Sequence, residues 1–189
     1  MPISKPNKAR LYLAVYTSFN SSNVEYAFIV APKSESLDPR VLDATKYHCR
    51  QNASRNDDSF SSSSTAQSSQ PWLFEQLALN ASTDPDLLVR ICISKLDNLQ
   101  AFEQSLQKVP VSQGDPDFTP EWWLQMAWSQ LQYEQMLSKE STWSWGTILG
   151  TANRYLQEKK HLGRLSTSKS RGMQPAPVYD MMTKKEIIV

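Results

Sequence analysis

The sequence predicts an α+β fold, in which a mainly antiparallel sheet from residues 10–96 packs against two long helices from the second half of the chain. Two observations support this class. Short segments rich in alternating or continuous apolar residues fill the first half, whereas apolar residues at helical spacing follow residue 118. With 189 residues, of which 40% are hydrophobic, the chain is long enough for one core, so we expect residues 1–189 to form a single domain.

Five segments of the first half are expected to be extended. Residues 10–16 carry apolar side chains on both faces, which suits a central strand. Residues 24–31 follow after a short polar turn, so the two strands are close enough in sequence to form a hairpin. The other three expected segments are residues 43–49, 72–79 and 87–94, and for residues 72–79 a helix is the alternative.

Two segments are expected to lack regular structure. Residues 52–70 include eight serines, and their only large apolar side chain is Phe60. Such a segment buries too little surface to offset its ordering entropy, so we interpret it as a disordered surface insertion. A phosphorylated regulatory loop is the alternative. Residues 164–174 are basic and serine-rich and predict a flexible link to a short C-terminal strand or docked tail.

The strongest local signal is a helix start at residues 118–123, Phe-Thr-Pro-Glu-Trp-Trp. Thr119 suits the N-cap, Pro120 suits the first helical position, and Glu121 complements the helix dipole. We expect this helix to continue to about residue 137.

Two further helices are expected on either side of it. A short helix over residues 99–108 is capped by Asn98 and ended by Pro110. A second long helix over residues 144–162 has a basic last turn, which its dipole favours, and Gly163 stops it.

The composition excludes several function classes. Because 20 Lys and Arg nearly balance 19 Asp and Glu, we expect neither nucleic acid nor a membrane as a partner. No apolar run approaches the roughly 20 residues that span a bilayer, and the start of the chain lacks the features of a signal peptide, so a cytoplasmic protein is expected. Two His, two Cys and five Gly predict no metal, no cofactor and no glycine-rich phosphate loop. An unidentified protein or small molecule is left as the partner.

The tryptophans are unusually concentrated, since five of the six fall within residues 122–145. Packing of helices on a sheet explains most of them, with an exposed patch for a partner or a small molecule as the alternative. The candidate binding residues are Trp122, Trp123 and Trp128.

His48 and Cys49 form the only adjacent pair of histidine and cysteine. Neighbours on a strand point to opposite faces, so these two cannot act on each other as base and nucleophile. We therefore expect a structural role for His48. Cys92, in the expected strand over residues 87–94, is expected to be a small packed side chain.

Seven strings, taken in order, resemble a family of small, mostly uncharacterised fungal proteins: RLYLAVY, EYAFIVAPK, TKYHCRQN, LLVRICISKL, VPV followed by DFTPEWW, RYLQEKKHLGR and PVYDMMTKKEIIV. The resemblance covers nearly the whole chain apart from residues 52–70. Members of that family show His-Trp or His-Tyr at the start of the second strand and Phe-Asn-Cys at the start of the first long helix. The resemblance implies a circularly permuted papain-like scaffold, in which a helix N-terminus activates the thiol and a strand histidine accepts its proton.

The chain departs from that pattern at both chemical positions. Glu25 stands where the histidine is expected, and Pro120, which has no nucleophile, stands where the cysteine is expected. The resemblance therefore implies a degenerate thiol-enzyme-like scaffold, used by a non-catalytic interaction or accessory protein. Tyr47-His48 matches a Tyr-His pair of the family, which implies a shared structural role for His48.

The alternative is a small enzyme, namely a hydrolase, acyltransferase or isomerase, with secondary metabolism as one setting. It would use a tryptophan-lined pocket with Glu25 and His48. The candidate catalytic residues are Glu25, His48 and Thr119, and this alternative requires them to converge within hydrogen-bond reach.

Overall fold

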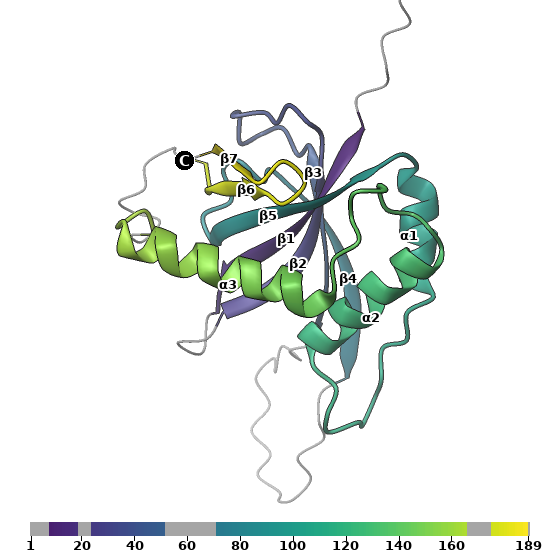
Figure 1. The fold of residues 1–189 in the computed structure, drawn as a ribbon. Coiled ribbons are helices and arrows are strands. Elements are labelled where there is room, and N and C mark those ends of the chain that lie inside the picture. The colour runs from purple at the N-terminus through teal and green to yellow at the C-terminus, as the bar shows by residue number, and fades with distance from the viewer. Residues whose placement is uncertain (1–7, 19–23, 52–70, 166–174, 189) are drawn as a thin grey trace, which may run out of the picture.

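Seven strands and three helices make up the fold of the computed structural model, which describes residues 8–18, 24–51, 71–165 and 175–188. The strands form one sheet in the order β4-β3-β2-β1-β5-β6-β7, and the helices cover one of its faces (Figure 1). The strands are β1 (Ala9–Thr17), β2 (Val24–Ala31), β3 (Ala44–Gln51), β4 (Trp72–Leu79), β5 (Leu87–Leu96), β6 (Val178–Asp180) and β7 (Lys185–Ile188). The helices are α1 (Leu99–Gln107), α2 (Pro120–Tyr133) and α3 (Trp145–His161).

The expected α+β class with a mainly antiparallel sheet is confirmed. β1 lies in the middle between β2 and β5, which explains why residues 11–16 are apolar on both faces and buried. The sheet does not end at residue 96, however, because β6 pairs with β5 in parallel and β7 pairs with β6. Residues 52–70, and residues 166–174 of the expected basic link, lie outside the described residues.

The helices agree with the sequence except at the end of α2. Side chains cap all three N-termini, and Thr119 Oγ1 accepts a hydrogen bond of 3.0 Å from the backbone N–H of Trp122. α2 stops at Tyr133 instead of residue 137, because Gln135 takes the left-handed backbone conformation with a φ of 55°. A right-handed helix cannot continue through such a residue.

The second face of the sheet is covered by two connecting segments, residues 32–43 and residues 80–86. Asn80 joins them, since its Nδ2 donates to the backbone carbonyls of Ser36, Asp38 and Val41 at 2.8–3.0 Å. On this face, polar contacts join the two connecting segments, and the described helices lie on the other face.

A buried ion pair lies under the same segments. The Arg90 side chain is 0% exposed, and its Nη1 lies 2.8 Å from Glu35 Oε1. The guanidinium carbon also lies 4.9 Å from the ring centroid of Tyr12. Glu35 uses its second oxygen to accept a hydrogen bond from Ser82. The charge of β5 on this face is thus compensated by a residue of the segment between β2 and β3.

Candidate functional site

β2 and β3 pair over only part of their length, and this creates the main cavity that the described residues form. Their pairs run from Val30–Thr45 to Phe28–Tyr47, although β2 starts at Val24 and β3 continues to Gln51. The unpaired ends line a cavity of about 520 Å³, together with the start of β4 and the start of α2.

The N-terminus of α2 is held at this cavity by aromatic packing. Phe118 packs against Trp72 with ring centroids 5.4 Å apart, and Trp123 packs against Phe74 at 5.1 Å. Thr119 and Pro120 thereby face the space between β2 and β3. This is where the resemblance places the nucleophile of a thiol enzyme.

Glu25, His48 and Thr119 all line this cavity, as the enzyme interpretation requires. Each of them is nevertheless bonded to another group. Glu25 accepts from Ser18, His48 bonds Glu75, and Thr119 accepts from the backbone of α2. Within the described ranges, no hydrogen bond joins any two of the three candidates.

Strand alternation explains why Glu25 does not meet Thr119. Tyr26 of β2 lies on the helix side, where its hydroxyl donates to Asn153 Oδ1 of α3 at 2.6 Å. Its neighbour Glu25 lies on the opposite face, where it also lines a smaller cavity with Tyr16 and Lys46. Glu25 and Thr119 therefore reach the main cavity from opposite faces of the sheet.

His48 is neutral near pH 7. Burial and the positive charge of Lys46 lower its pKa to about 4, against the opposing attraction of Glu75. Glu75 is already shared with Arg50, which approaches both of its oxygens at 2.8 Å. Since a carboxylate only accepts, His48 Nε2 carries the proton and donates to Glu75 Oε2 across the β3–β4 pair.

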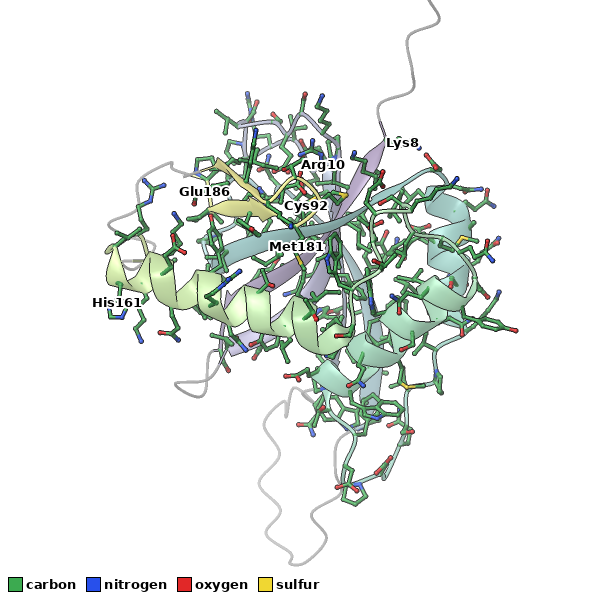
Figure 2. The ribbon with its side chains drawn as sticks, viewed as in Figure 1. Lys8, Arg10, Cys92, His161, Met181 and Glu186 are labelled. Carbon is green, nitrogen blue, oxygen red and sulfur yellow. The ribbon has the colours of Figure 1, made fainter. Side chains whose placement is uncertain are left out.

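Neither cysteine is a poised nucleophile. Cys49 lies in the wall of the cavity, but it is buried, and burial raises its pKa to about 12. Burial, helped by the negative charge of Asp180, raises the pKa of Cys92 to about 12 as well. Figure 2 places Cys92 within the sheet. Both side chains are thiols and not thiolates at neutral pH.

The three candidate tryptophans lie in two different environments. Trp123 and Trp128 are in the core, where the indole N–H of Trp128 donates to the backbone of Trp143, so neither ring reaches the surface. Trp122 is 37% exposed and packs on Phe118. The tryptophan that lines the cavity is Trp72, which was not among the expected binding residues. The available sequence signal was its place at the start of the expected strand over residues 72–79.

The part of the chain that the structure describes offers no cluster of metal-ligating side chains. No group of three or more His, Cys, Asp or Glu side chains is arranged to hold a metal ion there. His161 lies at the C-terminal end of α3, at the periphery of the molecule (Figure 2). None of the described helices is both long enough and apolar enough to cross a bilayer.

His48 makes the stability of the fold pH-dependent. The folded pKa of about 4 lies below the ordinary value of 6.5, so between these pH values the unfolded chain binds a proton that the folded chain does not. Stability should therefore fall as the pH drops from 6.5 towards 4, and the unfolding equilibrium constant should rise by up to about tenfold per pH unit. Urea denaturation at several pH values measures this.

The matched control is His48→Gln, which keeps a hydrogen-bond donor but does not titrate. Its stability should change little between pH 6.5 and 5, a range that lies above the titration of ordinary carboxylates. The same slope in the variant and in the original protein would contradict the assignment to His48.

Comparison with known proteins gives a family and no function. No curated protein and no solved structure matches the chain. Residues 8–188 match a family model described as "Family of unknown function (DUF6914)". That match spans nearly the whole chain, in agreement with the resemblance to an uncharacterised family. The protein therefore belongs to this family of unknown function.

Proposed function

We propose that this protein is a non-catalytic binding protein, which receives its partner or small molecule at the cavity between β2 and β3. The observation that carries the proposal is Pro120, which occupies the first turn of α2 and faces that cavity. A helix N-terminus in this position would activate a thiol, but proline has none. The scaffold is then of the thiol-enzyme type without its nucleophile.

The remaining groups around the cavity support binding over catalysis. Thr119 is engaged as the cap of α2, and Cys49 keeps its proton. A general base must reach the proton that it removes, yet among the described residues His48 bonds Glu75 and neither Thr119 nor Glu25. The space itself, at about 520 Å³, lies in the usual range for small-molecule sites.

One observation favours the enzyme alternative, namely that Glu25 and His48 line the same cavity. If this pair performed acid–base catalysis, Glu25→Gln and His48→Gln would each abolish a turnover measured with the native protein. The non-catalytic proposal expects no turnover for either residue to support.

Chemical probes separate the two interpretations. Native protein is treated with a broad cysteine-reactive probe and with a fluorophosphonate, which labels activated hydroxyl nucleophiles. The proposal expects no labelling of the folded chain, followed by labelling of both cysteines after denaturation. Labelling of the folded protein that disappears in Cys49→Ser, or in Cys92→Ser, would establish a reactive thiol and defeat the proposal.

Binding at the cavity is tested by filling it. Glu121→Trp places a large ring at the cavity while keeping the Thr119 cap and Pro120, and Leu162→Trp places the same ring at the exposed end of α3. A partner captured from cells of the source organism by the original protein should be retained by Leu162→Trp and lost by Glu121→Trp. Equal retention by both variants would show that binding occurs elsewhere.

If the scaffold is of the thiol-enzyme type, a cysteine introduced as Pro120→Cys should be activated. A thiol at the start of α2 should have a pKa about one unit or more below the ordinary value, because the helix N-terminus stabilises the thiolate. At pH 7 it should react with iodoacetamide about tenfold faster than Leu162→Cys, which lies at the opposite pole of a helix. The native cysteines are buried and should not react with iodoacetamide. Identical pH–rate profiles for the two variants would contradict activation at this position.

A further inference from the structure

The outer edge of β4 is a regular strand edge without the features that usually prevent pairing with another strand. β4 pairs with β3 over eight consecutive residues with no bulge, and it is the terminal strand of the sheet that the described residues form. Natural proteins blunt such edges with lysine, proline, bulges or very short strands. The sequence of β4, WLFEQLAL, contains none of these devices.

The contacts of Gln113 identify which backbone groups face outward. Its side-chain amide accepts from the N–H of Trp72 at 2.9 Å and donates to the C=O of Trp72 at 2.7 Å. In an antiparallel ladder the N–H and C=O of one residue point to the same side, and successive residues alternate. The backbone groups of Phe74, Gln76 and Ala78 therefore also point away from β3.

The same contact limits the free stretch. Gln113 occupies the edge at Trp72, and within the described part of the chain no other strand pairs with the outer edge of residues 73–79, whose midpoint is Gln76. An antiparallel strand that uses the whole stretch has its centre at this residue. A free edge centred on one residue can pair with a copy of itself around a two-fold axis.

The acidic residue of β4 is compensated on the face of the sheet away from the helices, where Glu75 is held by Arg50. Leu73 and Leu77 lie beside it and are 40% and 42% exposed. On the helix side, Glu103 of α1 accepts hydrogen bonds from Tyr47 and Gln76, which are both neutral. Two copies can thus approach on the leucine side without repulsion between their Glu75 carboxylates.

We propose that β4 pairs with β4 of a second copy of this chain, antiparallel and around a two-fold axis at Gln76, so that two sheets become one. In this register Gln76 faces Gln76 of the second copy, and Phe74 faces Ala78 of the second copy, a large side chain opposite a small one. Each of these pairs exchanges two backbone hydrogen bonds. An axis at Glu75 is less favourable, because it sets two carboxylates opposite each other.

Sedimentation of the full-length protein over a wide concentration range tests the assembly. The original protein should form a dimer, and so should Gln76→Ala, which keeps the outward N–H. Gln76→Pro should be a monomer, because proline removes that donor and leaves the β3 ladder intact. A monomer at every concentration for the original protein would overturn the proposal, as would an unchanged dimer for Gln76→Pro.

Cross-linking tests the register and does not depend on whether the proline variant folds. The two thiols of a Gln76→Cys dimer should lie close together, since directly opposite Cα atoms are about 5.5 Å apart. Those of Ala78→Cys should lie about 14 Å apart, four residues along the strand. The shortest bis-methanethiosulfonate reagent should therefore join the first variant and spare the second. Equal cross-linking of both variants, or of neither, would reject this pairing.

Discussion

Glu35→Ala should lower the free energy of unfolding by about 3–5 kcal/mol, the usual cost of leaving a buried charge without its partner. Arg90 is fully buried, and Glu35 is the carboxylate bonded to it, at 2.8 Å. Two other guanidinium nitrogens of Arg90, Nε and Nη2, have no hydrogen-bond partner among the described residues. The loss of Glu35 would therefore leave the buried guanidinium of Arg90 without a carboxylate partner. Urea denaturation followed by tryptophan fluorescence measures the change.

Asp38→Ala is the matched control for Glu35→Ala. Asp38 lies in the same segment and also pairs with an arginine, but its partner Arg40 is exposed to solvent. Exposed ion pairs contribute little to stability, so this variant should stay close to the original protein. Replacing both members of the buried pair, as in Glu35→Leu with Arg90→Met, should recover part of the loss. Equal losses for Glu35→Ala and Asp38→Ala would refute this account of the buried pair.

Trp123→Ala should cost about 3–5 kcal/mol, as expected for the removal of a large ring from a packed core. The Trp123 side chain is fully buried and stacks at a tilt on Phe74, which fixes the start of α2 over the sheet. Its neighbour Trp122 is partly exposed, so Trp122→Ala should cost much less. Thermal and urea denaturation of the two variants compare adjacent residues of the same type.

A third variant separates packing from hydrogen bonding at Trp123. The indole N–H of Trp123 is buried and has no hydrogen-bond partner in the described part of the chain. Trp123→Phe keeps most of the ring and removes this unmet donor, so its loss should be clearly smaller than that of Trp123→Ala. A similar loss for both variants would show that the shape of the indole itself, and not its volume, holds α2 in place.

The sequence predicted those parts of the fold that are set by residues adjacent in the chain. The apolar faces of β1 and the Thr119 cap are local features, and both are found as expected. The position of β6 in the sheet could not be predicted. Asp180 of this strand pairs with Cys92, and a segment of three residues carries no signal for a partner so far away in the chain. The early end of α2 depends on the backbone conformation of Gln135, which residue type does not determine.

The geometry of the candidate site could not be predicted from the sequence. Glu25, His48 and Thr119 line one cavity, but they do not bond one another there. Their separation depends on which face each strand residue occupies and on competing partners such as Glu75. Those partners come from strands far apart in the chain, and their register is set by the assembled sheet.

The late position of β6 and β7 in the chain has a kinetic consequence. β1 to β5 all lie within the first 96 residues, whereas β6 pairs with β5 across a segment of the chain that contains all three described helices. Closing so long a loop is slow and yields few backbone contacts, so this hairpin should dock late and detach first. When it detaches, Glu186 leaves Tyr155 and the buried ammonium of Lys159, and that charge is hydrated without unfolding of the helices. We therefore expect this hairpin to open and close as a small cooperative unit while the rest of the domain stays native.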